Sequence, residues 1–107
     1  MTDYIQVMTT TANRTDAQRI AQVVVEQRLA GCVQILGPIH STYWWEDEVQ
    51  HNEEYLCLIK TEAGMYDRLA AAIEAAHPYD VPEILAMPVQ RGSQPYLNWL
   101  SSEIHKK

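Results

Sequence analysis

The sequence predicts an α+β domain in which a long β-hairpin separates two helical segments. Apolar residues recur at the spacing of one helical face in residues 13–30 and again in residues 64–76. Residues 32–61 carry almost no helical periodicity and are rich in strand-forming side chains. The 107 residues amount to about one domain, so we expect residues 1–107 to fold around one core.

A strand and a helix are expected first. Residues 3–9 are rich in β-formers and too few for a helix, and the threonines that follow mark the end of the strand. Asn13 is a good helix N-cap, and Gly31 suits the left-handed position just beyond a helix. The inward face of this helix is predicted to consist of Ala17, Ile20, Ala21, Val24, Val25 and Leu29.

The hairpin follows, with an outgoing arm from Cys32, an acidic turn around residues 46–48 and a return arm over residues 49–61. Gly37 and Pro38 predict a bend or bulge in the outgoing arm, because proline cannot donate to a strand ladder. Both arms are longer than common strands, so the hairpin should project beyond its own core. The aromatic side chains Tyr43, Trp44 and Trp45 would then lie near an exposed tip that something should cover.

The rest of the chain adds a helix, a strand and a last helix. Residues 64–76 are predicted to form a helix that ends at His77-Pro78, with Met65, Leu69, Ile73 and Ala76 facing inward. Residues 83–90 are predicted to form a strand, in which Pro88 favours a sheet edge or the end of the strand. A helix after Ser93 would turn Tyr96, Leu97, Leu100 and Ile104 inward. The predicted order is the ferredoxin-like βαββαβ arrangement with an added C-terminal helix.

Charge and hydropathy exclude several classes of partner. The net charge of -6 opposes binding to nucleic acid or anionic membranes, which require clustered Lys and Arg. No apolar run is long enough to cross a membrane, and the first residues lack the pattern of a signal peptide. We therefore expect a cytoplasmic protein.

The two cysteines are not expected to form a disulfide. If the turn centres near Asp47, Cys57 faces about residue 37, roughly 16 Å along the strand from Cys32, whereas a disulfide tolerates at most about 7 Å between Cα atoms. Cys57 is predicted to be a buried core thiol. Cys32 begins a strand, where a thiol can be half exposed. The histidines and cysteines do not have zinc-site spacing.

Two polar segments have both a structural and a functional interpretation. The hairpin tip, residues 46–54, has five carboxylates and no Lys or Arg, which fits a solvated turn and, less well, a cation site. The loop at residues 77–83 is stiffened by two prolines and presents an imidazole, a phenol and two carboxylates. It is a rigid connector or a binding loop, and the residues alone favour neither. Nucleophile-elbow, phosphate-loop and dinucleotide-binding motifs are absent from the sequence.

Several motifs resemble one known family. The octapeptide at residues 77–84, His-Pro-Tyr-Asp-Val-Pro-Glu-Ile, resembles the H-P-Y-E-V-P-E-I signature of the CutA family of divalent-cation tolerance proteins. Further matches lie, in the family's order, at residues 28–33, 41–46, 54–61 and 96–99. The chain departs from the family pattern at Trp44 and Asp47, where relatives often have Arg and Gly.

The resemblance implies a tight PII-like homotrimer whose hairpins reach onto neighbouring subunits, and a link to tolerance of copper and other divalent metals. Cys32 matches a family cysteine proposed as a copper ligand. The positions suspected of lining a cleft between subunits are matched by Lys60, His77, Tyr79, Glu83 and Trp99.

Three functions follow from these expectations. The first is a cytoplasmic homotrimer that binds copper or another divalent metal ion, with Cys32 as the thiolate, His77 as its partner and no obligatory cofactor. The second is a PII-like sensor that binds a small anionic metabolite in the cleft, uses Lys60, and signals to an unidentified protein partner. The third is an enzyme with Cys32 as nucleophile, which we rank last because the sequence supplies no group to orient a base.

Overall fold

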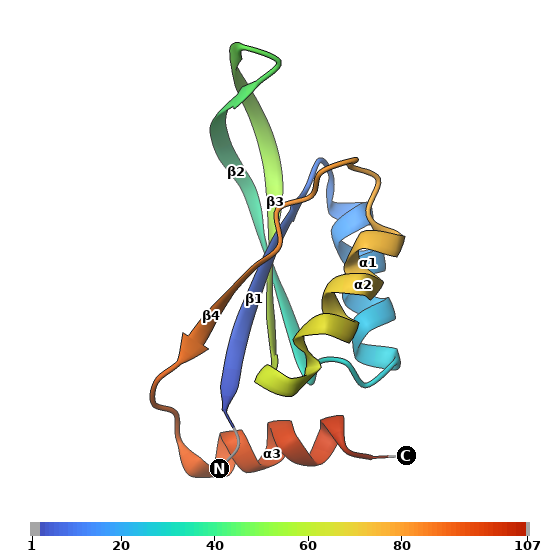
Figure 1. Cartoon of the computed structure of the whole chain (residues 1–107), viewed down its shortest axis with the longest axis vertical. Helices are drawn as coiled ribbons and strands as arrows, with labels where there is room; N and C mark the ends of the chain where they lie inside the picture. The colour runs from blue at the N-terminus through green and yellow to red at the C-terminus, as the bar shows by residue number, and fades with distance from the viewer. Residues whose placement is uncertain (1–2, 107) are drawn as a thin grey trace.

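A computed structural model of the chain describes residues 3–106 and has the predicted order of elements (Figure 1). The elements are β1 (Tyr4–Thr11), α1 (Arg14–Glu26), β2 (Cys32–Trp45), β3 (Glu48–Glu62), a short 3-10 turn (Ala63–Met65), α2 (Tyr66–Ala76), β4 (Leu85–Val89) and α3 (Gln94–Ile104). The prediction of a βαββαβ fold with a C-terminal helix is confirmed. β1 runs two residues further than predicted, and β4 is shorter at both ends.

The four strands form one antiparallel sheet in the order β2-β3-β1-β4. β1 is central, so that Val7 lies opposite Ile59 on one side and Ala86 on the other. Helices α1 and α2 cover one face of this sheet, and α3 lies across its end (Figure 1). We call the other face, over which no described helix packs, the open face. β4 is an edge strand, as the position of Pro88 predicted.

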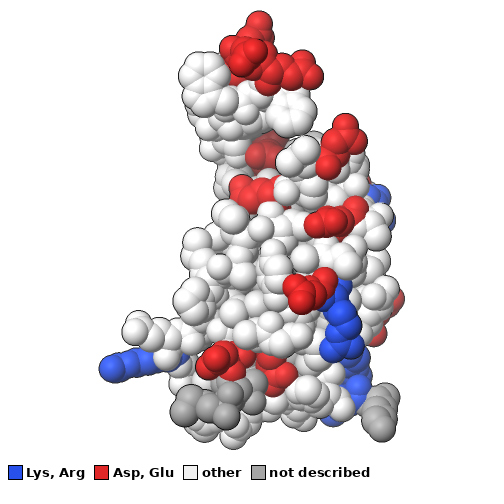
Figure 2. Space-filling view, in the orientation of Figure 1, with Lys and Arg blue, Asp and Glu red and all other residues white. Residues whose placement is uncertain are grey.

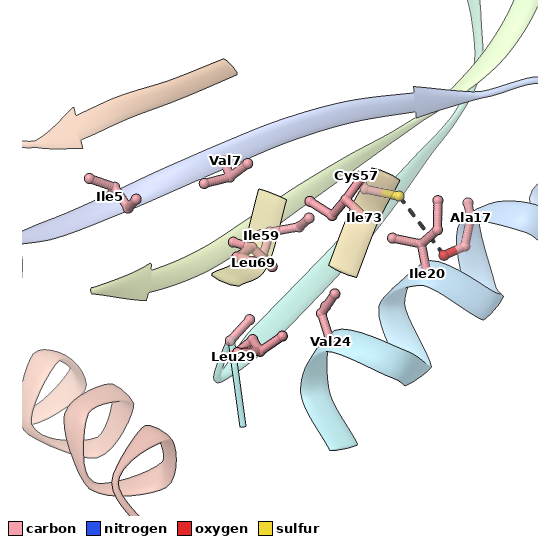
Figure 3. Close-up of a cluster of buried hydrophobic side chains, with 11 residues drawn as sticks. Ile5, Val7, Ala17, Ile20, Val24, Leu29, Cys57, Ile59, Leu69 and Ile73 are labelled. Carbon is pink, nitrogen blue, oxygen red and sulfur yellow. Dashed lines mark hydrogen bonds between the residues drawn. The ribbon is translucent and has the colours of Figure 1, made fainter. Parts of the chain in front are cut away.

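The core lies between the sheet and the two covering helices (Figure 3). Burial alternates along β1, where Ile5 and Val7 are buried and Gln6 is only partly covered, because successive strand side chains point to opposite faces. The side chains without any exposed surface include Val7, Ala17, Ile20, Val24, Cys57, Ile59, Leu69 and Ile73. Full burial of one aliphatic side chain of this size contributes about 1.5–3 kcal/mol.

The end of α1 differs from the prediction, because Gly31 is not its left-handed cap. Arg28 takes that position with φ of 60°, and the Leu29 backbone N–H donates to the Val24 carbonyl oxygen at 3.0 Å. Val24 and Leu29 are both in the core cluster, which supplies the apolar contact typical of this helix ending. A β-carbon at Gly31 would instead collide with the buried side chain of Leu100, so this glycine permits close approach of α3.

Two apolar residues that were predicted to face inward are exposed. Val25 of α1 is 39% exposed and Tyr96 of α3 is 40% exposed. Each lies at the margin of its helix's apolar stripe, where helical spacing does not decide between inside and outside. Tyr96 packs on Trp99 instead, with ring centroids 5.5 Å apart.

The β2–β3 hairpin is long and projects beyond both covering helices (Figure 1). Its tip is the two-residue turn Glu46-Asp47, with φ of 51° and 63°, and the pairing register shifts between Leu36 and Ile39 as the Gly37-Pro38 pair predicted. Trp44 near the tip is 73% exposed, so the prediction of an exposed aromatic tip is confirmed for the single chain.

Replacing Gly37 by alanine should lower the free energy of unfolding by about 1–3 kcal/mol, the usual cost of overpacking. A β-carbon at Gly37 would lie 2.9 Å from the Tyr55 ring carbons Cε2 and Cγ. The Arg14 guanidinium lies over the same ring, 4.9 Å from its centroid, and restricts its movement. Gly64 is the matched control, because a β-carbon there meets no atom within 4 Å. Urea unfolding should find Gly64→Ala neutral or stabilising by up to about 1 kcal/mol, and equal losses in the two variants would contradict the packing argument.

Candidate functional site

His77 fixes the start of the loop at residues 77–83. It follows the last helical residue of α2 and has an extended backbone, as expected before Pro78. Its buried ring has two partners: Nε2 lies 2.7 Å from the Thr10 carbonyl oxygen, and Nδ1 accepts from the Tyr79 backbone N–H at 3.1 Å. This pattern places the imidazole proton on Nε2, because a carbonyl can only accept. The imidazole therefore links the loop to the end of β1.

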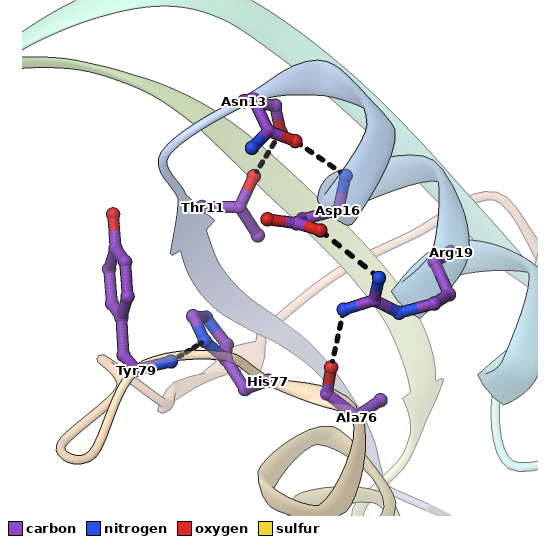
Figure 4. A network of polar contacts seen from close by, with 7 residues as sticks. All are labelled: Thr11, Asn13, Asp16, Arg19, Ala76, His77 and Tyr79. Atoms are coloured by element: carbon purple, nitrogen blue, oxygen red, sulfur yellow. Dashed lines mark hydrogen bonds and ion pairs between the residues drawn. The ribbon is translucent and has the colours of Figure 1, made fainter.

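A polar network holds the same loop against α1 (Figure 4). Arg19 forms an ion pair with Asp16 at 3.1 Å and donates to the Ala76 carbonyl oxygen at 2.9 Å. The Asn13 side chain caps α1 by accepting from the Asp16 backbone N–H at 2.8 Å. Arg19 satisfies a carbonyl in the last turn of α2, where helix carbonyls lack intrahelical partners. The loop therefore begins at a fixed position.

Tyr79 connects the loop to the hairpin. Its hydroxyl donates to Glu54 Oε2 at 2.9 Å, and Glu54 is only 8% exposed. Burial, followed by the hydrogen bond to Glu54, raises the pKa of the Tyr79 hydroxyl above its usual range. The phenol therefore stays protonated and remains a donor to the carboxylate at neutral pH.

An open groove of about 310 Å³ lies between the hairpin and the loop. We call it the loop groove, and its lining residues are Thr10, Tyr43, Trp45, Glu54, Tyr79, Asp80, Val81 and Glu83. Three of these residues are carboxylates, and none is Lys or Arg. Acidic side chains also gather at the hairpin tip above it (Figure 2). The groove therefore has a negative potential that opposes the binding of an anion.

A second group of predicted site residues lies at the other end of the subunit. Cys32 is partly exposed and pairs with Lys60 across the β2–β3 ladder, and the Lys60 ammonium donates to the Gln34 side chain. Tyr96 lies beside Cys32, and partial burial of its hydroxyl, followed by the neighbouring Cys32 thiol, raises the pKa of that hydroxyl. Trp99 packs on Tyr96. We call Cys32, Lys60, Tyr96 and Trp99 the thiol cluster.

The structure does not bring Cys32 and His77 together within one subunit, although they were predicted to share a metal ion. His77 contacts Thr10, which pairs with Leu56, whereas Cys32 pairs with Lys60, four positions further along β3. Four positions correspond to about 13 Å of strand. No three His, Cys, Asp or Glu residues within residues 3–106 form a group that could hold a metal ion.

The other predicted site residues divide in the same way. Lys60 and Trp99 lie in the thiol cluster, whereas Tyr79 and Glu83 line the loop groove. One anion therefore cannot contact both Lys60 and the loop of the same subunit. Glu54 is a residue of this groove that was not among the predicted site residues. The available signal was its position next to the apolar block that begins at Tyr55, because a carboxylate beside a buried strand segment is often covered and paired.

Cys57 is a core thiol, as predicted. It has no exposed surface, its Sγ contacts the Ala17 carbonyl oxygen at 3.9 Å, and it pairs with Ile35 (Figure 3). Cys32 lies three positions from Ile35 along β2. This corresponds to about 10 Å at the usual rise per strand residue, which is too far for a disulfide with Cys57. Both cysteines are free.

Burial raises the pKa of the Cys57 thiol to about 11, which predicts a loss of stability at alkaline pH. The unfolded chain releases this proton near pH 9, whereas the folded chain keeps it until about pH 11. The contribution of the protonated Cys57 thiol to the free energy of unfolding is therefore complete below about pH 9. It falls by about 2–3 kcal/mol as the pH rises to 11. Urea unfolding from about pH 8 to pH 11 should show a steeper decline for wild type than for Cys57→Ala. Parallel declines would mean that Cys57 does not contribute.

The fold and the two sites define a ferredoxin-like α+β protein with a projecting hairpin and no complete metal centre among its described residues. Residues 5–103 match the family model described as CutA1 divalent ion tolerance protein. The chain therefore belongs to the CutA1 divalent ion tolerance protein family. This confirms the resemblance found in the loop and hairpin motifs.

Individual relatives agree with this assignment. The chain is 42% identical to the divalent-cation tolerance protein CutA of Thermus thermophilus over 94 residues, which cover 88% of this chain and 91% of that protein. It is 41% identical over 98 residues to the chloroplastic protein CutA 1 of Oryza sativa, covering 92% of this chain and 55% of the rice protein. The chain thus spans about half the length of the rice relative. A crystal structure of CutA1 from Oryza sativa superposes with a TM-score of 0.94 at 38% identity, covering 98% of this chain and 96% of that one.

No helix within residues 3–106 is both long enough and apolar enough to cross a bilayer.

Proposed function

We propose that the chain is a homotrimeric divalent-cation tolerance protein that binds copper or another divalent metal ion through Cys32. The observation that carries this proposal is a free, partly exposed thiol at the start of β2 in a chain of this family. Thiolates are soft ligands and favour copper and zinc over magnesium or calcium. Cys57 does not compete for this role, because it has no exposed surface and its pKa is raised.

The open face supports the homotrimer. Its exposed apolar side chains include Leu36, Leu85, Met87 and Val89, at 46%, 53%, 49% and 37%. An apolar surface that spans several strands is typical of protein interfaces. The exposed aromatic tip of the hairpin supports an interface for the same reason. The resemblance to the family implies that three copies assemble.

A trimer would also explain why the predicted cleft residues are divided within one subunit. We propose that the thiol cluster of one subunit faces the loop groove of its neighbour, so that Lys60 and Trp99 complete a cleft with Tyr79 and Glu83. His77 serves mainly to anchor the loop. His77 can bind a metal ion through Nδ1 only after the hydrogen bond from the Tyr79 backbone N–H to that atom is broken.

Binding of copper by Cys32 is tested by competition for Cu(I) against a chromophoric chelator. Cys32→Ser should weaken Cu(I) binding by at least about tenfold, because an alcohol replaces the soft ligand. Cys57→Ala is the matched control and should bind as wild type does. A His77→Gln variant should also retain binding. Equal affinities for wild type and Cys32→Ser would remove the proposed ligand.

We further propose that the protein is cytoplasmic and acts by binding rather than by catalysis. The family description names tolerance and no reaction. Cytosolic thiols stay reduced, which agrees with two free cysteines. His77, the imidazole that was predicted as the partner of Cys32, is hydrogen-bonded to the Thr10 carbonyl oxygen and does not serve Cys32 as a general base within one subunit.

A further inference from the structure

We propose that the Lys60 ammonium of one subunit is the resident cation of the neighbouring subunit's loop groove, and that it makes the metal site selective for thiophilic ions over hard divalent cations. This role of Lys60 rests on the proposed homotrimer, in which the thiol cluster faces that groove. It would make Lys60 the residue that controls which metal ions enter.

The loop groove has a negative charge that the trimer would cover. Glu54, Asp80 and Glu83 line the groove, and none of them belongs to an ion pair within residues 3–106. The Tyr79 hydroxyl binds Glu54, but it is a neutral donor and leaves the charge uncompensated. A carboxylate that loses its water without gaining a positive partner is strongly destabilising. A neighbouring subunit that covers the groove is therefore expected to supply a cation.

Lys60 is the only Lys or Arg in the four strands. Its side chain lies on the open face, because the flanking Ile59 and Thr61 are buried on the helix-covered face and successive strand side chains alternate. Among the described residues its ammonium donates to the neutral Gln34 side chain and forms no ion pair. A lysine ammonium ends a flexible four-carbon stem, so it can turn towards a carboxylate on a facing surface. The cluster and the groove are therefore complementary in charge.

The position of Lys60 beside Cys32 gives it influence over metal binding. The two residues are directly opposed on neighbouring strands, where Cβ atoms lie about 4.5–5.5 Å apart. The ammonium repels any metal ion that approaches Cys32. A thiophilic ion offsets this repulsion through its bond to the thiolate, whereas Mg²⁺ and Mn²⁺ prefer oxygen ligands and gain little from sulfur.

The groove carboxylates alone do not compensate a hard cation. In the described part of one subunit, no three Asp, Glu, His or Cys side chains form a group that could hold a metal ion. A hard cation would therefore have to displace the ammonium for an incomplete set of oxygen ligands. Loss of the Lys60 charge should open the site to such ions.

The experiment compares Zn²⁺ with Mn²⁺, which have equal charge and differ in their preference for sulfur. Zn²⁺ is titrated by competition with a chromophoric chelator, and Mn²⁺ by the electron paramagnetic resonance signal of the free ion. Lys60→Met removes the ammonium and keeps an unbranched side chain. It should bind Mn²⁺ at least about tenfold more tightly than wild type does, with a smaller change for Zn²⁺. Unchanged Mn²⁺ affinity, or equal gains for the two ions, would overturn the proposal.

Lys106→Met is the matched control, because Lys106 pairs with Glu103 of its own subunit and lies outside the thiol cluster. It should leave both affinities as they are in wild type. An equal gain of Mn²⁺ binding in the two lysine variants would reveal a general effect of net charge and would contradict the role of Lys60. If Lys60→Met is monomeric without metal, Mn²⁺ should restore its trimer, and failure to do so would count against that role.

A charge swap tests the contact across the interface. Lys60→Glu adds a fourth carboxylate to the covered groove and should shift the trimer towards monomer in sedimentation velocity. A second substitution, Glu83→Lys or Asp80→Lys, should restore the trimer because opposite charges again face each other. Glu74→Lys, at an exposed position of α2 outside the loop groove, should not restore it. An unaltered trimer in Lys60→Glu, failure of both swaps, or rescue by Glu74→Lys would rule out the contact.

Wild type separates the role of Lys60 from the proposed function. A monomeric wild type would overturn both. A trimeric wild type that binds Cu(I) through Cys32, together with an unchanged metal preference in Lys60→Met, would overturn the role of Lys60 alone.

Discussion

Replacing Ile59 by alanine is expected to lower the free energy of unfolding by about 2–5 kcal/mol. Ile59 has no exposed surface and lies on β3 between Val7 of β1 and Val33 of β2. Its side chain belongs to the buried cluster that includes residues of β1, α1 and α2, so the truncation leaves a cavity beneath the covering helices. Urea unfolding at one fixed protein concentration measures the effect, because stability depends on concentration in an oligomer.

Two controls separate the cavity from a general loss of apolar surface. Ile59→Val removes one methylene at the same position and should cost about 0.5–1.5 kcal/mol. Val25→Ala alters a 39% exposed side chain on α1 and should cost less than about 1 kcal/mol. If Ile59→Ala were no more destabilising than Val25→Ala, the core would not be centred on β3.

The order of elements could be predicted from the sequence because hydrophobic periodicity changes clearly between segments. The helical spacing before residue 30 and after residue 64 and the strand-forming run between them correspond to α1, α2 and the hairpin. The end of α1 could not be predicted from Gly31, because a left-handed residue at Arg28 is stabilised by its backbone bonds and by packing of Leu29 on the core. Packing of Leu29 on the core therefore outweighed the preference of glycine for the left-handed conformation.

The candidate site could be predicted in part. The family motifs and the two prolines pointed to the loop at residues 77–83, and the structure places Tyr79 and Glu83 in a groove there. The use of both His77 nitrogens could not be foreseen, because one partner is a backbone carbonyl 67 residues earlier in the chain. The contribution of Glu54 depends on a hydrogen bond from the Tyr79 hydroxyl, which lies 25 residues later in the chain. Sequence spacing does not show that the hairpin and the loop meet at this point.

Replacing Met87 by lysine should dissociate the proposed trimer into monomers. Met87 lies on the edge strand β4, pairs with Gln6, and is 49% exposed on the open face of the subunit. In a trimer with its open faces packed together, the lysine would bury a charge without a partner, at a cost of several kcal/mol per subunit. Sedimentation velocity should therefore find wild type at three subunit masses and Met87→Lys at one.

Val25→Lys is the matched control for this prediction, since Val25 is 39% exposed on a covering helix rather than on the open face. It should remain trimeric. A trimeric Met87→Lys would place the interface elsewhere, and a monomeric wild type would contradict the trimer itself. Any copper site that depends on a neighbouring subunit should be lost in the monomeric variant.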